Sequence, residues 1–249
     1  MTSDAGCLRG AESVEVEFAE GHNGPPGVVQ GGTLAGRMAD VLGGPAEVTL
    51  RRPAPLRTPL QLERHGSTAT LRLGKEVFAG AMLAEVSVEV PAPPSFATAE
   101  AASRAYLGHT RHPFPTCWVC GTKRAPGDGM RIFAGAVQGT NTVAALWTPD
   151  ASLTAAHDLV EPVFLWAALD CPGGWAAVVD MAPRPVVLGR IAARVDRPVH
   201  AGIPYIVMAW KLATEGRKHH VGSAIFTAGG VTCAVARAIW FDVDAEEWS

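Results

Sequence analysis

An aspartate follows the most apolar stretch of the sequence. Seven consecutive apolar residues, 163–169, lead directly into Asp170, and Cys171-Pro172-Gly173-Gly174 come next. A segment that is apolar on all sides predicts a buried helix, and the proline with two glycines predicts that this helix ends there. The helix dipole and burial both disfavour a carboxylate at such a place. Asp170 therefore either accepts hydrogen bonds from the following turn or is a desolvated carboxylate with a raised pKa, suited to act as base or nucleophile.

A second candidate group is Gln30-Gly31-Gly32-Thr33, which stands where a helix over residues 33–42 is predicted to begin. Backbone N–H groups at a helix N-terminus form a positive site for an anion or an oxyanion. Glycine lets a ligand approach the backbone closely, and the side chain of Gln30 is suited to orient a water molecule. The alternative is that the glycines only allow the helix to pack closely against a strand.

Cys117 and Cys120 form a Cys-x2-Cys pair, and His109 and His112 lie shortly upstream. Four such ligands suit one structural zinc ion. The alternative is a pair of reduced thiols packed together, because a second cysteine pair is missing from the sequence. A thioredoxin-type redox site is disfavoured, since no strand–helix unit follows the pair.

The elements that must position these groups follow a pattern that occurs twice. In the first part, a strand and a loop precede the helix at 33–42, and strands are predicted at 46–51, 60–64, 68–73 and 77–90. A proline-rich break at 91–94 and a short helix at 97–107 follow. The second part has strands at 130–133 and 142–147, then the buried helix, and then strands at 186–195, 205–212, 222–226 and 231–241.

Short motifs support an internal repeat because they match in the same order in both parts. Gly43-Gly44 matches Gly173-Gly174, Arg52-Pro53 matches Arg197-Pro198, and the final strands also correspond. The additional residues of the second part fall in a loop, as a structural repeat predicts. This register places Asp40 opposite Asp170, but Arg37 lies one turn before Asp40 and predicts an ion pair on the helix surface.

One long buried helix with antiparallel strands is typical of the α+β class, and its order here resembles the hotdog fold. Two copies in one chain resemble the double-hotdog acyl-CoA thioesterases, tandem hotdogs in which each half wraps an antiparallel sheet around one long central helix. Gln30-Gly31-Gly32 resembles the His-Gly-Gly or Gln-Gly-Gly motif of many hotdog thioesterases, and Asp170, nine residues after Glu161, resembles their helix aspartate. The expected parts are an N-terminal half, a linker carrying the Cys-x2-Cys motif, and a C-terminal half, at 1–90, 91–127 and 128–249.

The resemblance implies hydrolysis of an acyl-CoA-type thioester at a site between the halves, with Gly31 of one half facing Asp170 of the other. In this hypothesis Asp170 activates water or attacks directly, Gln30 positions water, and the Gly31 and Gly32 amides hold the oxyanion. No cofactor is required for this reaction, and the zinc ion that the cysteine pair suggests would be structural. Further expected substrate contacts are Asn23, Thr33 and Trp166. Two interpretations remain open for a group of basic residues: they bind the phosphates of coenzyme A, or they are solvent-exposed charges. The group consists of Arg184, Arg190, Arg194 and the loop 217–220.

Two departures from the family pattern support an alternative function. Neither helix start carries the usual histidine, and Val160-Glu161-Pro162 stands where the second half would be expected to have Gly-Gly. A non-catalytic acyl-CoA or lipid-binding hotdog protein is therefore the alternative. A hydratase on the same fold is disfavoured, because the sequence contains no Asp-x4-His pair.

Composition limits the partners and the location. Hydrophobic residues make up 48% of the chain and charged residues 18%, and the net charge of −3 without a basic block argues against nucleic acid. No apolar run reaches the ~18 residues that span a bilayer, so we expect a cytoplasmic protein without a membrane span. Five cysteines fit reduced thiols better than a disulfide framework. A chain with two hotdog halves forms a pseudo-dimer, and its further pairing into a homodimer is compatible with the sequence.

Overall fold

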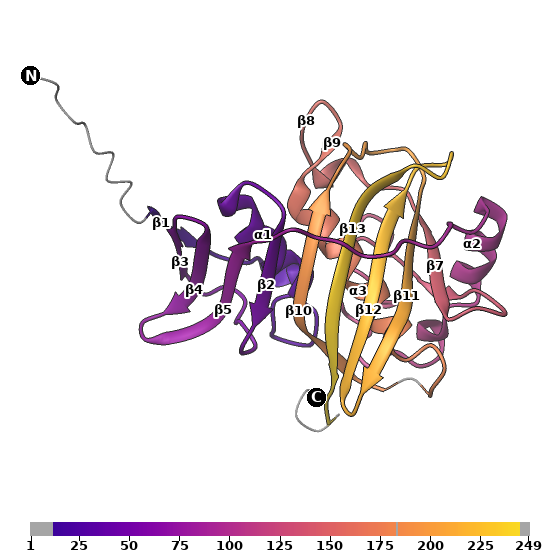
Figure 1. Cartoon of the computed structure of the whole chain (residues 1–249), viewed down its shortest axis with the longest axis horizontal. Helices are drawn as coiled ribbons and strands as arrows, with labels where there is room; N and C mark the ends of the chain where they lie inside the picture. Colours follow the sequence, from indigo (N-terminus) through magenta and orange to yellow (C-terminus); the bar gives the residue numbers. More distant parts are fainter. Residues whose placement is uncertain (1–11, 183, 245–249) are drawn as a thin grey trace, which may run out of the picture.

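The computed structural model describes residues 12–182 and 184–244, in which eleven strands form one antiparallel sheet (Figure 1). The strands of the first half are β1 (Glu12–Val16), β2 (Ala46–Leu50), β3 (Leu60–His65), β4 (Thr68–Leu73) and β5 (Glu76–Leu83). The strands of the second half are β6 (Gly135–Ala136), β7 (Thr142–Trp147), β10 (Val186–Val195), β11 (Tyr205–Glu215), β12 (Lys218–Phe226) and β13 (Thr232–Asp242). A separate small hairpin pairs β8 (Thr154–Ala156) with β9 (Leu159–Val160).

The two halves of the sheet have the same strand order, read outward from the centre. The first half runs β2, β5, β4, β3 and β1, and the second runs β10, β13, β12, β11 and β7, with β6 at the far edge. The halves meet where β2 pairs with β10, with Ala46 opposite Ala193 and Thr49 opposite Arg190. Each half therefore places the strand that follows its helix at the centre of the common sheet.

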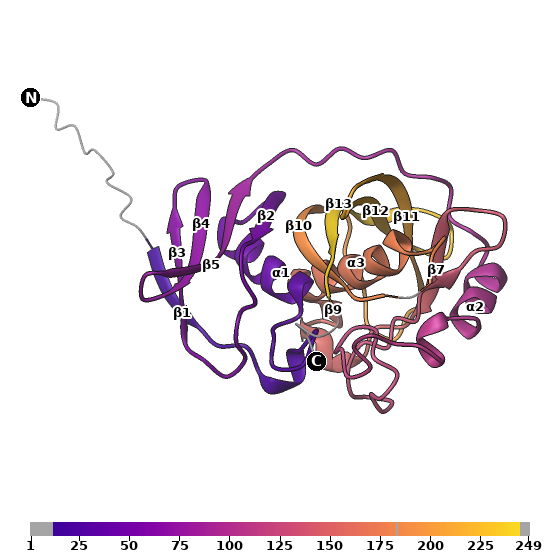
Figure 2. The same cartoon turned by 90° about the horizontal axis from the view of Figure 1, so that it is seen from below.

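Two helices, α1 (Gly31–Leu42) and α3 (Pro162–Ala177), lie side by side on one face of this sheet (Figures 1 and 2). The side chain of Gln30 caps the start of α1 by accepting a hydrogen bond from the Thr33 N–H, and Gly43, with φ of 75°, ends the helix in the left-handed conformation. Pro162 starts α3, at a position where its missing N–H costs no hydrogen bond. Almost all of α3 is buried, as its apolar sequence predicted.

The predicted end of α3 at Pro172-Gly173-Gly174 is wrong, because the helix continues to Ala177. A Cβ atom on Gly173 or Gly174 would lie 3.0 or 2.9 Å from the Trp240 ring of β13. The glycines therefore provide room for Trp240 and do not end the helix. Asp170 consequently lies inside α3, so the interpretation of Asp170 as the cap of a turn is also wrong.

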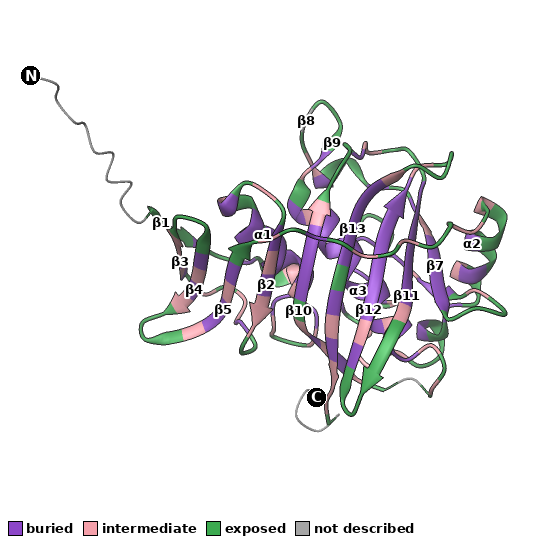
Figure 3. Ribbon diagram, viewed as in Figure 1, coloured by how far each residue is buried: buried purple, intermediate pink, exposed green. Residues whose placement is uncertain are grey.

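The opposite face of the sheet is covered by the connection between the halves. This connection, residues 84–95, crosses the sheet in an extended form and leads into α2 (Phe96–Arg104) (Figures 1 and 2). A second apolar cluster lies here and joins Val86 and the α2 residues Ala99 and Ala102 to the sheet. Buried sheet residues in this cluster are Ala144, Ala192, Ile206, Met208, Trp210, Ala224, Phe226 and Val235. With α3 on one face and this layer on the other, long stretches of β11 and β12 are buried on both sides (Figure 3).

Two predicted strands differ from the observed structure. The strand expected at 77–90 ends at Leu83, because Val86 and its neighbours pack on top of the sheet and do not pair within it. The segment 130–133 is not a strand of the sheet. It instead pairs its backbone with the Cys-x2-Cys loop, where Met130 N–H donates to Trp118 O and Ile132 N–H donates to Val119 O. The prediction failed here because a loop that packs on one side has the same alternation of buried and exposed residues as a strand.

Among residues 12–182 and 184–244, no helix has the length and apolar character required to cross a membrane.

The contact of Gly174 with Trp240 predicts that a side chain at this position destabilises the fold. We expect Gly174→Val to lower the free energy of unfolding by about 1–3 kcal/mol, because the added atoms overpack a buried site. Urea-induced unfolding followed by circular dichroism measures this change. Gly80→Val in β5 is the matched control, since a Cβ there meets nothing within 4 Å. Equal losses in the two variants would contradict the steric role of Gly174.

Candidate active site

The two helices approach each other so closely that only glycine fits at two positions of α1. A Cβ on Gly32 would lie 2.5 Å from the Asp170 Cβ and 2.7 Å from the Trp166 carbonyl oxygen. A Cβ on Gly36 would lie 2.7 Å from the Val163 carbonyl oxygen. The contact moves backward along α3 as α1 advances, so the helices run in opposite directions. The N-terminus of α1 is thereby brought against the middle of α3, beside Asp170.

Asp170 is held by two hydrogen bonds from the start of α1. Its Oδ2 accepts from the Gly32 N–H at 2.7 Å and from Gln30 Nε2 at 2.5 Å. The Gln30 Oε1 in turn accepts from the Thr33 N–H at 2.7 Å and the Thr33 hydroxyl at 2.8 Å. All three side chains are buried. Both ends of the Gln30 amide are therefore engaged within the protein, and its Nε2 contacts Asp170.

The second carboxylate oxygen of Asp170, Oδ1, is buried and has no hydrogen-bond partner among the described residues. Burial raises the pKa of Asp170 to about 8, against the opposing effect of the Gly32 N–H; the nearby Cys117 raises the pKa further, and the Gln30 amide lowers it. A carboxyl group with this pKa exchanges its proton near neutral pH, as a general base must. The positive end of the α1 dipole favours the ionised form.

A cavity of about 280 Å³ adjoins this group and is lined by Gln30, Gly31 and Asp170. Gly31 is the first residue of α1, so its N–H has no acceptor within the helix. Much of the wall is apolar and includes Val29, Leu34, Phe114, Trp175, Leu188 and Trp240. Three exposed arginines, Arg51, Arg52 and Arg184, also line it. The cavity therefore combines a carboxyl group, a helix N-terminus, an apolar wall and positive charge.

Several predicted site residues lie elsewhere or act differently. Asn23 does not line the cavity; its Nδ2 donates to Gly24 O and to the Thr116 hydroxyl, and its Oδ1 accepts from Arg124. Trp166 is buried in the helix contact below Gly36 and also does not line the cavity. Thr33 contacts Gln30, and the Gly32 N–H already bonds Asp170, which leaves the Gly31 N–H as the amide available for an oxyanion.

The predicted cations divide into one that lines the cavity and others that do not. Arg184 lines the cavity and also forms an ion pair with Asp242 at 3.0 Å. Arg190 pairs with Glu47 at 3.3 Å, and Arg194 pairs with Asp196 at 3.0 Å. These two arginines, and the loop 217–220, do not line the cavity among the residues described. The sequence analysis did not predict Arg51 and Arg52 as site residues, because only their charge suggests a contact with a phosphate.

The matching aspartate of the first helix has a different environment, as predicted. Asp40 is half exposed and lies 3.7 Å from Arg37. The buried carboxyl group is therefore present in α3 and not in α1, which makes the site asymmetric.

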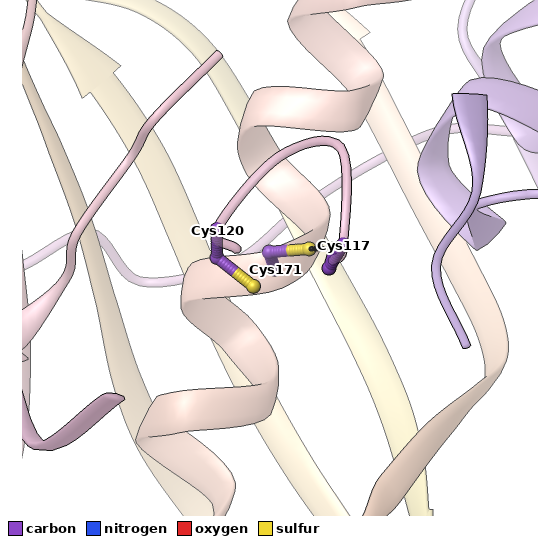
Figure 4. A group of neighbouring side chains, drawn as sticks. All are labelled: Cys117, Cys120 and Cys171. Carbon is purple, nitrogen blue, oxygen red and sulfur yellow. Dashed lines mark hydrogen bonds between the residues drawn. The ribbon is translucent and has the colours of Figure 1, made fainter. Parts of the chain in front are cut away.

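The cysteine pair lies beside the site and has an unpredicted third member. The sulfur atoms of Cys117, Cys120 and Cys171 all lie within 4.8 Å of one another (Figure 4). The two histidines predicted as zinc ligands make other contacts. His112 contacts the Cys120 carbonyl and accepts a hydrogen bond from the Phe114 N–H, and His109 packs against the Tyr106 ring. The sequence analysis did not include Cys171, because only the folded structure brings the linker cysteines next to α3.

Comparisons with known proteins identify the fold. No protein-family model matches the chain, and no curated protein matches its sequence. Among solved structures, the tesB protein of Mycobacterium avium subs paratuberculosis aligns over 93% of each chain with a TM-score of 0.62 and 11% identity. A protein of unknown function with a hot dog fold from Alicyclobacillus acidocaldarius aligns over 94% of this chain and 93% of its own, with a TM-score of 0.58 and 14% identity.

A third similar structure is the acyl-CoA thioesterase II of Mycobacterium marinum, at 12% identity and a TM-score of 0.50, covering 87% of this chain and 91% of that one. At such low identities the likeness concerns the fold alone. This chain therefore has the hotdog fold, which confirms that part of the prediction.

The buried carboxyl group predicts a specific pH dependence of stability. The unfolded chain releases the Asp170 proton near its ordinary pKa of 3.8, whereas the folded protein keeps it until about pH 8. The unfolded state therefore binds fewer protons between these values, and this group destabilises the fold increasingly as the pH rises from about 4 to 8. Asp170→Asn keeps an acceptor but cannot ionise, so its advantage over wild type should grow over this range.

We expect that advantage to be small at pH 4 and to reach several kcal/mol at pH 8, since one pKa unit corresponds to about 1.4 kcal/mol. Urea unfolding at both pH values, in buffer with a reductant and a chelator, measures it. Asp40→Asn, on the exposed side of α1, is the control. A difference between Asp170→Asn and wild type that does not change with pH would show that the carboxyl group titrates normally.

Proposed function

We propose that this chain hydrolyses an acyl-CoA-type thioester in the cavity between its two hotdog halves. The observation that carries the proposal is the buried Asp170, bonded through one oxygen to the start of α1 and carrying a second oxygen that has no partner within residues 12–182 and 184–244. Known structures of this fold include thioesterases, among them the acyl-CoA thioesterase II of Mycobacterium marinum. Fold alone does not determine function, so the chemistry of the site carries the argument.

The proposed reaction uses the ionised form of Asp170. Its Oδ1 either takes a proton from water, which then attacks the thioester carbonyl, or attacks that carbonyl itself to form an anhydride that water subsequently cleaves. In both routes the carbon–sulfur bond breaks, the thiolate leaves and takes up a proton, and a carboxylic acid is released. The Gly31 N–H stabilises the negative carbonyl oxygen that forms during attack. Gln30 is a positioning residue that holds the carboxylate.

The walls of the cavity fit the two ends of such a substrate. The apolar residues Leu188, Trp175 and Phe114 suit an acyl chain, and the cavity of about 280 Å³ suits a small ligand group. Arginine side chains bind phosphate oxygens strongly. We therefore assign Arg51, Arg52 and Arg184 to the phosphates of coenzyme A.

We further propose that the two halves arose by internal duplication of one hotdog unit. The shared strand order supports this, as do the matched motifs in the sequence. In this view residues 1–90 and 128–249 are the halves and 91–127 is the linker, and each half contributes one central helix. The site is then built from the start of one central helix and the middle of the other.

The alternative is a protein that binds acyl-CoA or a lipid without hydrolysis. The observation that favours it is the Gly32 N–H, which already bonds Asp170 and leaves one amide for the oxyanion. Isothermal calorimetry would reveal tight acyl-CoA binding without release of heat from turnover in that case. A cytoplasmic location, assembly into a homodimer and a lack of nucleic-acid binding remain part of the proposal, the last supported by the net charge of −3.

Removal of the Asp170 charge should abolish most of the activity. We expect Asp170→Asn to lower kcat/KM for acyl-CoA by about 10²–10⁴-fold, the usual contribution of a general base. Thiol release from a panel of acyl-CoAs measures this, with circular dichroism to confirm the fold. Asp40→Asn is the matched control and should retain full activity. A folded Asp170→Asn variant with wild-type rates would remove this residue from the mechanism.

The assignment of Arg184 predicts a defect that depends on the nucleotide part of the substrate. We expect Arg184→Ala to raise KM for acyl-CoA several-fold and to leave KM unchanged for the same acyl group on N-acetylcysteamine, which lacks the phosphates. The control is Arg190→Ala, which removes an equally exposed arginine outside the cavity. An equal effect on both substrates would indicate a structural role for Arg184 through its ion pair with Asp242.

A further inference from the structure

Three free cysteines from two distant segments meet at the boundary between the linker and α3 (Figure 4). Cys117 and Cys120 belong to the loop between α2 and β6, and Cys171 belongs to α3. All three are buried. Reduced thiols are ordinary residues of a protein core, but three sulfur atoms within 4.8 Å of one another form the beginning of a metal-binding set.

The spacing of the sulfur atoms matches tetrahedral coordination. Zinc–sulfur bonds of about 2.3 Å at the tetrahedral angle place two sulfur atoms about 3.8 Å apart. The Cys117 and Cys171 sulfur atoms are 3.6 Å apart, and the widest separation in the group is below 4.8 Å. A disulfide needs about 2.0 Å. The three side chains therefore require little movement to bind one ion.

A tight turn in the loop positions Cys117 close to Cys120. Gly121 N–H donates to the Cys117 carbonyl at 2.8 Å, and a Cβ on Gly121 would lie 2.4 Å from that same oxygen. The turn consequently requires glycine after the second cysteine. This tight turn keeps Cys117 and Cys120 close together, with their sulfur atoms within 4.8 Å of each other.

The Cys171 sulfur has a donor from α1, because Gln30 Nε2 lies 3.4 Å from it. A bound divalent cation deprotonates its thiol ligands, so the three buried thiols would bind it as thiolates.

We propose that Cys117, Cys120 and Cys171 bind one thiophilic divalent cation, zinc, through three thiolates. A sulfur-rich tetrahedral set selects zinc over magnesium or calcium. All three cysteines line the cavity that also contains Asp170, so the fourth coordination position is taken by water or by another small ligand from that cavity. His112 contacts the backbone of Cys120 and acts outside the ligand set. The ion links the loop that carries Cys117 and Cys120 to α3 through Cys171, the residue next to Asp170.

Metal analysis of the full-length protein tests this proposal directly. The protein is purified with a reductant and without added metal, and zinc is measured by mass spectrometry of the elements. We expect about one equivalent per chain. After removal of the zinc, addition of Co²⁺ alone should produce the intense near-ultraviolet bands of thiolate-to-cobalt charge transfer and the visible bands of a tetrahedral site.

Matched variants identify the ligands. Cys117→Ser, Cys120→Ser and Cys171→Ser should each weaken cobalt binding at least tenfold and reduce the charge-transfer band. Cys233→Ser is the control, because Cys233 is also buried and free but lies in β13 outside the cluster. His109→Gln and His112→Gln should keep the charge-transfer band in full. Circular dichroism verifies that each variant is folded.

Three results would overturn the proposal. The first is reduced wild-type protein with less than about a tenth of an equivalent of zinc and no cobalt charge-transfer band, which needs no variant to interpret. The second is a full band in folded Cys171→Ser, or its loss in either histidine variant. The third is a disulfide within the cluster in protein kept under reductant. These measurements do not involve thioester hydrolysis, so they stand or fall independently of the proposed function.

Discussion

The close contact between α1 and α3 is the constraint on which the site depends. Gly32 and Gly36 allow the backbones to meet, and this brings a helix N-terminus to the carboxyl group of Asp170. The same contact removes that carboxyl group from water, which raises its pKa to about 8, while the Gly32 N–H limits the rise. Hydrogen bonding therefore lowers the pKa of Asp170 while burial raises it, and the balance lets this carboxyl group exchange its proton near neutral pH.

Much of the fold could be predicted from the sequence because its elements follow local rules. The apolar run of α3, the glycines at the start of α1 and the alternating strands each reflect periodicity or backbone freedom. Predictions failed where a distant residue determined the local structure. Gly173 and Gly174 look like a helix end in sequence, but they accommodate Trp240 of β13. Val86 looks like part of a strand, but it packs on the outer face of the sheet.

The candidate site was predictable to a similar degree. Asp170 and Gln30 were identified from their conflict with local preference and from a family resemblance, and the structure places them in contact. Their exact partners depend on how two segments more than a hundred residues apart meet, which a single sequence does not reveal. For this reason Cys171, Arg51 and Arg52 were missed, and Asn23 and Trp166, which were expected to contact the substrate, do not line the cavity.

The linker across the outer face of the sheet also bears on the asymmetry of the site. It joins the two halves covalently and packs over the sheet beside the β2–β10 seam, where four residue pairs join the two strands. A tether of this kind replaces the association of two separate chains by an intramolecular step with a high effective concentration. Under the duplication proposed above, each half can then accumulate substitutions that would weaken a dimer of identical chains. The buried Asp170 in α3 and the half-exposed Asp40 in α1 are the kind of difference that such a tether allows.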